Sequence, residues 1–308
     1  MIKQEEDVEP YVSLADITEI ELLILQRMRE KTMGEHRSRS QGSGFDFIGL
    51  RDWQAGDRFS SIDWAQSSLQ GFSPFVVREF DQPSTATVTA IADVSLSTRC
   101  GLDGVPIAAA VARAIATIGM SAVFFQDPFG LLTFDEGFRH LAGIRPRTGK
   151  GQVVHCLDAY QLRRGLTEVP RHGDLSNTLS GYMRSTSMLP VISDFLFDDA
   201  PAVVRELSML NVLHDVFIVM IDSAFAFELP DVSAGWIEAV DVETGREQIL
   251  SRQTLASLAK HAREWQAEVK RVAKDRDMDV VPLGLDSTQA DIALSEFVGE
   301  RRLRKISN

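Results

Sequence analysis

The sequence has few of the residues on which disulfide-bonded and zinc-binding proteins depend. Among 308 residues there are two cysteines, Cys100 and Cys156, and six histidines. Two cysteines exclude a disulfide framework and a cysteine-based zinc site, and such scarcity is typical of a reducing, cytoplasmic compartment. The histidines are scattered, and none forms the His-Glu-x-x-His pattern of a zinc protease.

Sequence signatures of catalysis are also missing. There is no Gly-x-Ser-x-Gly elbow for a nucleophile, and no Gly-x-Gly-x-x-Gly follows an expected strand. Residues 143–151 resemble a phosphate-binding loop, but five residues separate the glycines instead of four. Gly151 also stands where a Ser or Thr would hold magnesium, and Pro146 removes one backbone N–H from the loop. We therefore expect no nucleotide to bind there.

Positive charge is in short supply. The chain has 32 Lys and Arg against 44 Asp and Glu, a formal net charge of −12. Such a protein is a poor candidate for binding nucleic acid or an anionic membrane by charge. The apolar run 105–125 carries Pro106, Arg113 and Gly119, and a central arginine costs about 2.5–3.5 kcal/mol on insertion scales. We predict a buried helix over 105–118 and a strand over 121–126, and no membrane span.

An apolar content of 44% is enough for a core, and the length fits one α/β domain with an appendage. We assign residues 1–85 to an N-terminal helix, from Ser13 to about Lys31, and an irregular β appendage packed on the core. Residues 86–308 alternate strands with helices, which predicts a doubly wound, mostly parallel sheet with helices on both faces. The expected strands are 86–92, 121–126, 129–134, 188–193, 214–221, 235–241 and 278–283. The expected helices of this domain are 105–118, 151–163, 176–186, 200–211, 252–275 and 288–299.

Two expected strands are followed directly by acidic residues. Asp93, Ser95 and Ser97 come after strand 86–92, and Asp194 comes after strand 188–193. In an open α/β sheet, ligands bind beyond the carboxyl ends of the strands, and alternate residues of an extended segment point the same way. Oxygen ligands without nitrogen or sulfur suit Mg²⁺. The alternative is that both acids only cap local turns.

Opposite charges and two indoles are interleaved between residues 51 and 64. Such a set usually forms an ion-pair network that pins an irregular segment in place, with Arg planes stacked on Trp. The alternative is a docking surface for a partner, whose candidate residues are Arg51, Asp57, Arg58 and Asp63. A second charged segment, Arg301-Arg302-Leu303-Arg304-Lys305, is basic, and we expect it to be solvated or to contact an acidic partner.

Several of these motifs together match a known pattern. Gly34, Arg37-Ser38 and Gly42-Ser43-Gly44-Phe45-Asp46-Phe47 are followed by Leu50-Arg51-Asp52-Trp53-Gln54-Ala55-Gly56-Asp57-Arg58, Ile62-Asp63-Trp64 and Val77-Arg78-Glu79-Phe80. Over about residues 14–215 the chain resembles the bacterial family known as domain of unknown function 58. That family is similar to von Willebrand factor A domains, which implies a doubly wound α/β fold and a metal-ion-dependent adhesion site.

In such a site an Asp-x-Ser-x-Ser loop, a threonine and a further aspartate surround Mg²⁺, for which Mn²⁺ can substitute. Carried over by the resemblance, the metal-site residues are Asp93, Ser95, Ser97, Thr148 and Asp194. The two serines would bind the ion directly, and Asp93 directly or through water. Thr178 is the alternative to Thr148, and Phe195 stands where the adhesion-domain pattern more often has glycine.

The resemblance also implies a function. Members of the family are commonly encoded beside MoxR-type AAA+ ATPases, which implies an adaptor or co-chaperone whose partner is the ATPase or its client protein. A magnesium held by hydroxyls and waters keeps an open position that a partner's carboxylate can fill, with no bond made or broken. We expect a non-enzymatic, cytoplasmic interaction module. The alternatives are a metal-free structural scaffold and a magnesium-dependent hydrolase.

Overall fold

The computed structural model describes residues 10–35, 46–54, 62–81, 86–102, 105–135, 137–223, 236–240, 247–284 and 286–306. The chain divides into two compact units, one made of Met1–Arg29 and Thr85–Arg304, the other of Glu30–Ser84 and Lys305–Asn308. The N-terminal helix, which the sequence analysis placed in the appendage, lies in the first unit up to Arg29, and its last turns fall in the second. Its earlier part belongs to the first unit because Ile17, Ile20 and Ile24 are buried in the same apolar core as the strands of the sheet.

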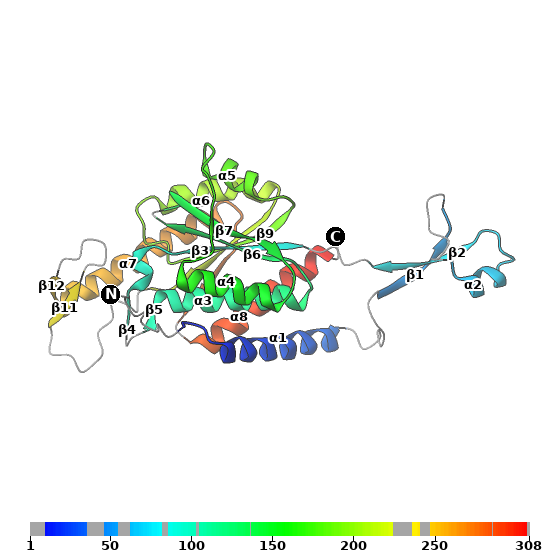
Figure 1. Ribbon diagram of the computed structural model, residues 1–308, viewed down its shortest axis with the longest axis horizontal. Coiled ribbons are helices and arrows are strands. Elements are labelled where there is room, and N and C mark those ends of the chain that lie inside the picture. Colours follow the sequence, from blue (N-terminus) through cyan, green and yellow to red (C-terminus); the bar gives the residue numbers. More distant parts are fainter. Residues whose placement is uncertain are drawn as a thin grey trace, which may run out of the picture. The chain divides into compact units, whose positions relative to one another are not determined.

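A seven-stranded sheet forms the centre of the first unit, in the order β13-β10-β9-β3-β6-β7-β8 (Figure 1). The strands from β13 to β6 run parallel to one another, whereas β7 and β8 are antiparallel to their neighbours. The predicted mixed α/β fold with a mainly parallel sheet is therefore confirmed. The strands are β3 (Thr87–Asp93), β6 (Phe129–Asp135), β7 (His140–Arg147), β8 (Thr167–Glu168), β9 (Ser187–Ser193), β10 (Asp215–Ile221) and β13 (Val280–Leu283).

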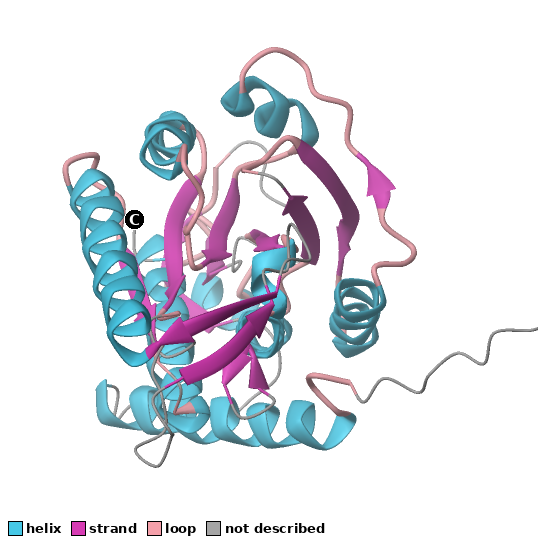
Figure 2. Cartoon of the chain, turned by 90° about the vertical axis from the view of Figure 1, so that its left-hand side faces the viewer, coloured by secondary structure: helices cyan, strands magenta, loops and turns pink. Residues whose placement is uncertain are grey.

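Helices cover both faces of this sheet (Figures 1 and 2). One apolar core lies under α1 (Leu14–Glu35), α3 (Ile107–Phe124), α4 (Lys150–Leu162) and α8 (Ser287–Ile306). The other lies under α5 (Leu175–Tyr182), α6 (Ala200–Met209) and α7 (Arg252–Lys274). Alternate residues of a strand face opposite sides, so Val88 and Ala90 enter the first core and Ile91 the second. Burial on both faces explains why these strands read as continuous apolar runs.

Shorter elements complete the two units. The expected strand 235–241 is present as β11 (Trp236–Val240), but it pairs with β12 (Glu247–Ser251) in a separate two-stranded sheet and not with the central sheet as described. The first unit also contains β4 (Gly101–Leu102), β5 (Val105–Pro106) and the 3-10 turns η2 (Leu96–Arg99) and η3 (Leu210–Val212). The second unit contains the antiparallel pair β1 (Asp46–Asp52) and β2 (Val76–Asp81) with helix α2 (Trp64–Leu69).

The expected strand over 121–126 is wrong. Helix α3 runs on to Phe124, and the Ser121 hydroxyl donates to the Thr117 carbonyl one turn earlier, at 2.8 Å. Strand β6 forms an antiparallel hairpin with β7. Among the described residues α3 is the one helix long and apolar enough to cross a membrane, yet 72% of it is buried inside the protein. Such burial is typical of a core helix.

The first two residues of the basic segment, Arg301 and Arg302, are paired with acids and are not free in solvent. Arg302 donates from Nε to Oδ2 of Asp127 at 2.7 Å, and both side chains are 2% exposed. Arg301 donates to Asp215 on β10, also at 2.7 Å. The carboxylate of Asp127 further accepts the N–H of Ala86 at 2.9 Å. Because a buried charge requires a partner, these pairs tie α8 to the sheet.

Candidate functional site

The site begins where β3 ends. Asp93 is the last residue of that strand and is almost fully buried. Its Oδ1 accepts the backbone N–H of Ser95 at 2.8 Å, and its Oδ2 accepts the hydroxyl of Ser193, on β9, at 2.6 Å. Tyr160 of α4 donates to the Asp93 carbonyl at 3.0 Å, and the Arg163 guanidinium donates to the carbonyl of Val94. The carboxylate and its loop are therefore held from three directions.

The two serines of the Asp-x-Ser-x-Ser loop lie side by side. Their hydroxyl oxygens are 2.9 Å apart. The sequence analysis expected them to converge because the loop is extended, but extension ends at Ser95, and η2 begins at Leu96. The Thr98 hydroxyl closes this turn by donating to the Ser95 carbonyl at 2.7 Å. The tight turn thus brings the hydroxyls of Ser95 and Ser97 together.

Asp194 follows the neighbouring parallel strand. Because Ala92 is level with Ile192 in the sheet, β3 and β9 end together, and Ser193 links the two ends. Oδ1 of Asp194 accepts the N–H of Leu196 at 3.1 Å. Oδ2 is buried and has no hydrogen-bond partner among the described residues. Such an orphaned buried carboxylate oxygen is rare in a folded protein.

The position after Asp194 keeps a glycine-like backbone. Phe195 has a φ of 56°, in the left-handed region that a bulky residue rarely adopts. Its ring is fully buried in the core under α6 and α7. Its carbonyl accepts the indole N–H of Trp265 at 2.9 Å, and Gln266 donates to the carbonyl of Asp194 at the same distance. Helix α7 therefore holds the turn in a conformation that a glycine would adopt without strain.

The two carboxylates are electrostatically unfavourable together. Burial raises the pKa of Asp194 to about 7, and the nearby charge of Asp93 adds to this effect. The pKa of Asp93 is also raised, chiefly by burial, while its hydrogen bonds to Ser193 and Ser95 oppose the rise. Neither carboxylate forms an ion pair with any residue that the structure describes. The site therefore has two buried acids and, within the part of the chain that the structure describes, no ion-pair partner to compensate them.

The site lies where the winding of the chain reverses. From β3 the chain passes to β6 on one side and later to β9 on the other, so β3 and β9 meet at the switch point of the sheet. Crevices outside the carboxyl ends of strands at such a point are the usual ligand sites of α/β proteins.

The structure does not bring Thr148 to this site. Thr148 follows Arg147, which is level with Phe129 at the start of β6, whereas Asp93 is level with Phe134 near its end. Five residues of strand separate these levels, about 17 Å at 3.3 Å per residue. Because β7 is antiparallel, it carries the threonine to the opposite end of the sheet. The hydroxyl of Thr178, the alternative, is bonded to the backbone of His172 and Asp174 around the start of α5.

The interleaved charges of residues 51–64 fall in the second unit. Asp63 begins α2, and its Oδ1 accepts the N–H groups of Ala65 and Gln66, both at 3.1 Å. Its carboxylate therefore caps a helix. Arg51 donates to the carbonyl of Asp52 at 3.1 Å. The other two candidates, at positions 57 and 58, lie outside the described residues.

Sequence reasoning missed the residues that hold the acids in place. These are Ser193, Tyr160 and Gln266, which contact the site from β9, α4 and α7. Only Ser193 has a local signal, because it is a hydroxyl at the end of a buried strand beside an acid. The other two are separated from their partners by 67 and 72 residues.

The fold and the site together define the class of protein: a mixed α/β protein with carboxylates and hydroxyls at the switch point of its sheet. A family model described as "Protein of unknown function DUF58" matches residues 49–271. The chain belongs to this family, which confirms the resemblance seen in the sequence. No curated protein matches the chain.

Several solved structures are similar to the chain, among them three from bacteria. The conserved hypothetical protein BatB from Bacteroides thetaiotaomicron has a TM-score of 0.43 at 13% identity, and the match covers 72% of this chain and 98% of that one. An aerotolerance-related membrane protein from Bacteroides fragilis NCTC 9343 has 0.41 at 13%, over 70% and 99%. The pilus adhesin SpaC from Lactobacillus rhamnosus GG has 0.39 at 11%, over 73% and 31%.

Proposed function

We propose that this chain is a non-enzymatic protein-interaction module whose Mg²⁺ site lies between the ends of β3 and β9. Asp93, Ser95, Ser97 and Asp194 would hold the ion, and Mn²⁺ could replace it. The observation that carries the proposal is the buried Oδ2 of Asp194, which has no partner among the described residues and lies beside a second buried acid. A divalent cation would compensate both charges.

The side chains available as ligands determine how such an ion would be coordinated. Among the described residues no three His, Cys, Asp or Glu side chains are grouped to hold a metal. Mg²⁺ would therefore complete its shell with the serine hydroxyls and exchangeable waters, as it usually does in proteins. A carboxylate from a partner could displace one of these waters. Binding would then depend on the metal and be reversible.

The arrangement of the sheet supports a von Willebrand factor A-like, doubly wound fold. From β3 the chain winds outward in both directions, and helices cover both faces. From the family resemblance we further propose that the partner is a MoxR-type AAA+ ATPase or its client protein. In this proposal the chain acts as an adaptor or co-chaperone in the cytoplasm.

The first test is calorimetric titration of Mg²⁺, then Mn²⁺, into chelator-stripped protein. We expect saturation near one ion per chain, lost in Asp194→Asn and weakened in Ser97→Ala. Asp198→Asn is the matched control, because it removes an exposed carboxylate four residues along the same loop region. Absence of binding by the wild-type protein would remove the metal from the proposal.

The second test concerns the partner. A purified MoxR-type ATPase should bind the immobilised chain in Mg²⁺, and binding should fall in EDTA and in Asp194→Asn while Asp198→Asn retains it. Binding that ignores EDTA and Asp194→Asn would refute a metal-dependent interaction. No turnover of a phosphoester or peptide panel is expected.

A metal-free scaffold is the second candidate, and one observation favours it. Both carboxylate oxygens of Asp93 already accept hydrogen bonds from the protein, from the N–H of Ser95 and the hydroxyl of Ser193. If this function is correct, ten millimolar Mg²⁺ should leave the melting temperature unchanged at pH 8.

A further inference from the structure

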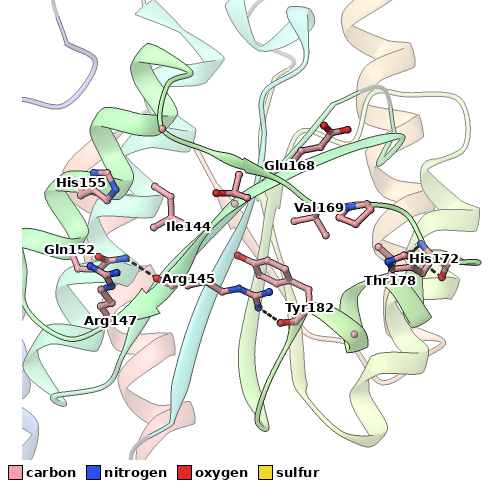
Figure 3. Close-up of a pocket in the computed structure, with 15 residues that line it drawn as sticks. Ile144, Arg145, Arg147, Gln152, His155, Glu168, Val169, His172, Thr178 and Tyr182 are labelled. Carbon is pink, nitrogen blue, oxygen red and sulfur yellow. Dashed lines mark hydrogen bonds between the residues drawn. The ribbon is translucent and has the colours of Figure 1, made fainter.

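A second polar cavity lies in another part of the sheet. It has a volume of about 470 Å³, is open to solvent, and is bordered by the later half of β7, by β8 and by helices α4 and α5 (Figure 3). Small-molecule sites commonly occupy about 300–1,000 Å³. The strand residues that line it, Gly143 to Arg147, are level with positions 129–132 of β6, whereas Asp93 is level with position 134. The cavity is therefore separate from the candidate metal site.

One buried hydroxyl in this cavity has no hydrogen-bond partner in the described part of the chain. Tyr182 is 7% exposed, and its Oη makes no hydrogen bond with any described residue. The hydroxyl lies over Gly143, since a Cβ built there would be 2.7 Å from it. Figure 3 shows the ring in the middle of the cavity, between Arg145 and Val169. Because unpaired buried hydroxyls are unfavourable and rare, this one points to a bound molecule that completes it.

The same tyrosine positions a positive charge. The Arg145 guanidinium lies over its ring, 3.9 Å from the centroid, and Nη1 donates to the Tyr182 carbonyl. These two contacts hold the guanidinium against the ring, and its other N–H groups have no partner among the described residues. A guanidinium fixed in this way can donate two parallel hydrogen bonds to a phosphate or carboxylate.

A second arginine and an imidazole also line the cavity. Arg147 is two residues along β7 from Arg145, and His155 projects from α4. Glu168 contributes one negative charge to the lining, whereas Arg145 and Arg147 contribute two positive charges. The net charge of these three side chains is therefore positive. A local excess of positive charge in a chain of net charge −12 favours a negatively charged ligand here.

An added β-strand fits this edge poorly. Strand β8 pairs with β7 only at Ala142 and Gly143, which leaves the later residues of β7 without a strand neighbour on that side. The side chain of Gln152, on α4, donates to the carbonyl of Arg145 at 3.1 Å. That acceptor is one that an incoming peptide strand would use. The cavity is therefore better suited to a small molecule.

We propose that this cavity binds a small anion with phosphate or carboxylate groups. The anion accepts hydrogen bonds from the guanidinium groups of Arg145 and Arg147 and from the hydroxyl of Tyr182. The site is independent of the proposed metal site, and Asp194→Asn should leave it unchanged.

The test is calorimetric titration of inorganic phosphate, pyrophosphate and citrate into the full chain in metal-free buffer. The first two probes represent phosphate ligands, and citrate represents carboxylates. We expect at least one probe to saturate near one molecule per chain. Tyr182→Phe should weaken binding about tenfold, or about 1.4 kcal/mol, without lowering the melting temperature of the free protein, because it removes only the unpaired hydroxyl.

Arg145→Gln should weaken binding at least tenfold, and Arg276→Gln is the matched control, because it removes an arginine charge on an exposed turn outside the cavity. The proposal is overturned if none of the three probes saturates the wild-type protein at ten millimolar. It is equally overturned if Tyr182→Phe and Arg145→Gln bind like the control. If Arg145→Gln unfolds early, the near-isosteric Tyr182→Phe variant decides the outcome.

Discussion

Replacement of Asp194 by asparagine should make the metal-free protein more stable at neutral and alkaline pH, and should abolish its response to Mg²⁺. The carboxyl group is buried and its folded-state pKa is raised to about 7 from 3.8. Below pH 3.8 the carboxyl group is neutral in both the folded and the unfolded state, and the free energy of unfolding has its full value. This free energy falls as the pH rises towards 7, because the unfolded state ionises first. Asparagine is neutral at every pH, and its oxygen can still accept the N–H of Leu196.

The size of the effect follows from the raised pKa. A rise from 3.8 to about 7 corresponds to about 4 kcal/mol of stability lost between these two values in the wild-type protein. The advantage of Asp194→Asn should therefore be near zero at pH 4, grow steadily, and level off above pH 7. For a domain of this size, about 4 kcal/mol corresponds to roughly 10 °C in melting temperature.

Thermal unfolding from pH 4 to 8.5, with EDTA or with ten millimolar Mg²⁺, measures both effects. Mg²⁺ should stabilise the wild-type protein at pH 8 and have little effect at pH 5, where Asp194 is protonated. Asp198→Asn should follow the wild-type curves, because that carboxylate is exposed. If Asp194→Asn is less stable than the wild-type protein at pH 8 in EDTA, our account of the buried acid pair is wrong.

Three further predictions concern stability. Ser193→Ala removes both the donor to Asp93 and an acceptor for a backbone N–H, so a loss of about 1–3 kcal/mol is expected in urea unfolding, and an unchanged midpoint would contradict it. Arg302→Met leaves a buried carboxylate unpaired and should cost about 3–5 kcal/mol by the same assay. Gly143→Ala should cost about 1–3 kcal/mol in thermal unfolding because its Cβ would meet two oxygens within 2.8 Å, whereas Gly151→Ala, with open space, should be neutral or stabilising.

Local signals in the sequence located most of the sheet. Strands β3, β6, β9 and β10 fall within a residue or two of the expected ranges, because each is a buried apolar run of strand length bounded by polar residues. The extension of α3 was missed because an Ala-rich apolar run suits either a helix or a buried strand. Packing decided it: Gly119 lies so close to Val153 on α4 that a Cβ would be 2.7 Å from it.

The residues of the candidate site were also predicted only in part. Asp93 and Asp194 were found because a strand end is a local property, and the two strands happen to be neighbours in the sheet. Thr148 was misplaced because its position depends on the direction of β7, which no residue near it specifies. The pairing of Arg302 with Asp127 spans 175 residues, and no local pattern in the sequence predicts it.

The sequence by itself determined the mixed α/β fold with a mainly parallel sheet, the family, and the four oxygen-bearing side chains at the ends of β3 and β9. These are properties of short segments, in which hydrophobic period, strand length and motif spacing act over a few residues. Only the tertiary structure decided that, among the described residues, one carboxylate oxygen of Asp194 and the hydroxyl of Tyr182 lack a hydrogen-bond partner. It also decided that Arg302 of α8 is buried in an ion pair with Asp127. Burial and charge environment depend on residues far apart in the chain, and so they exist only once the chain has folded.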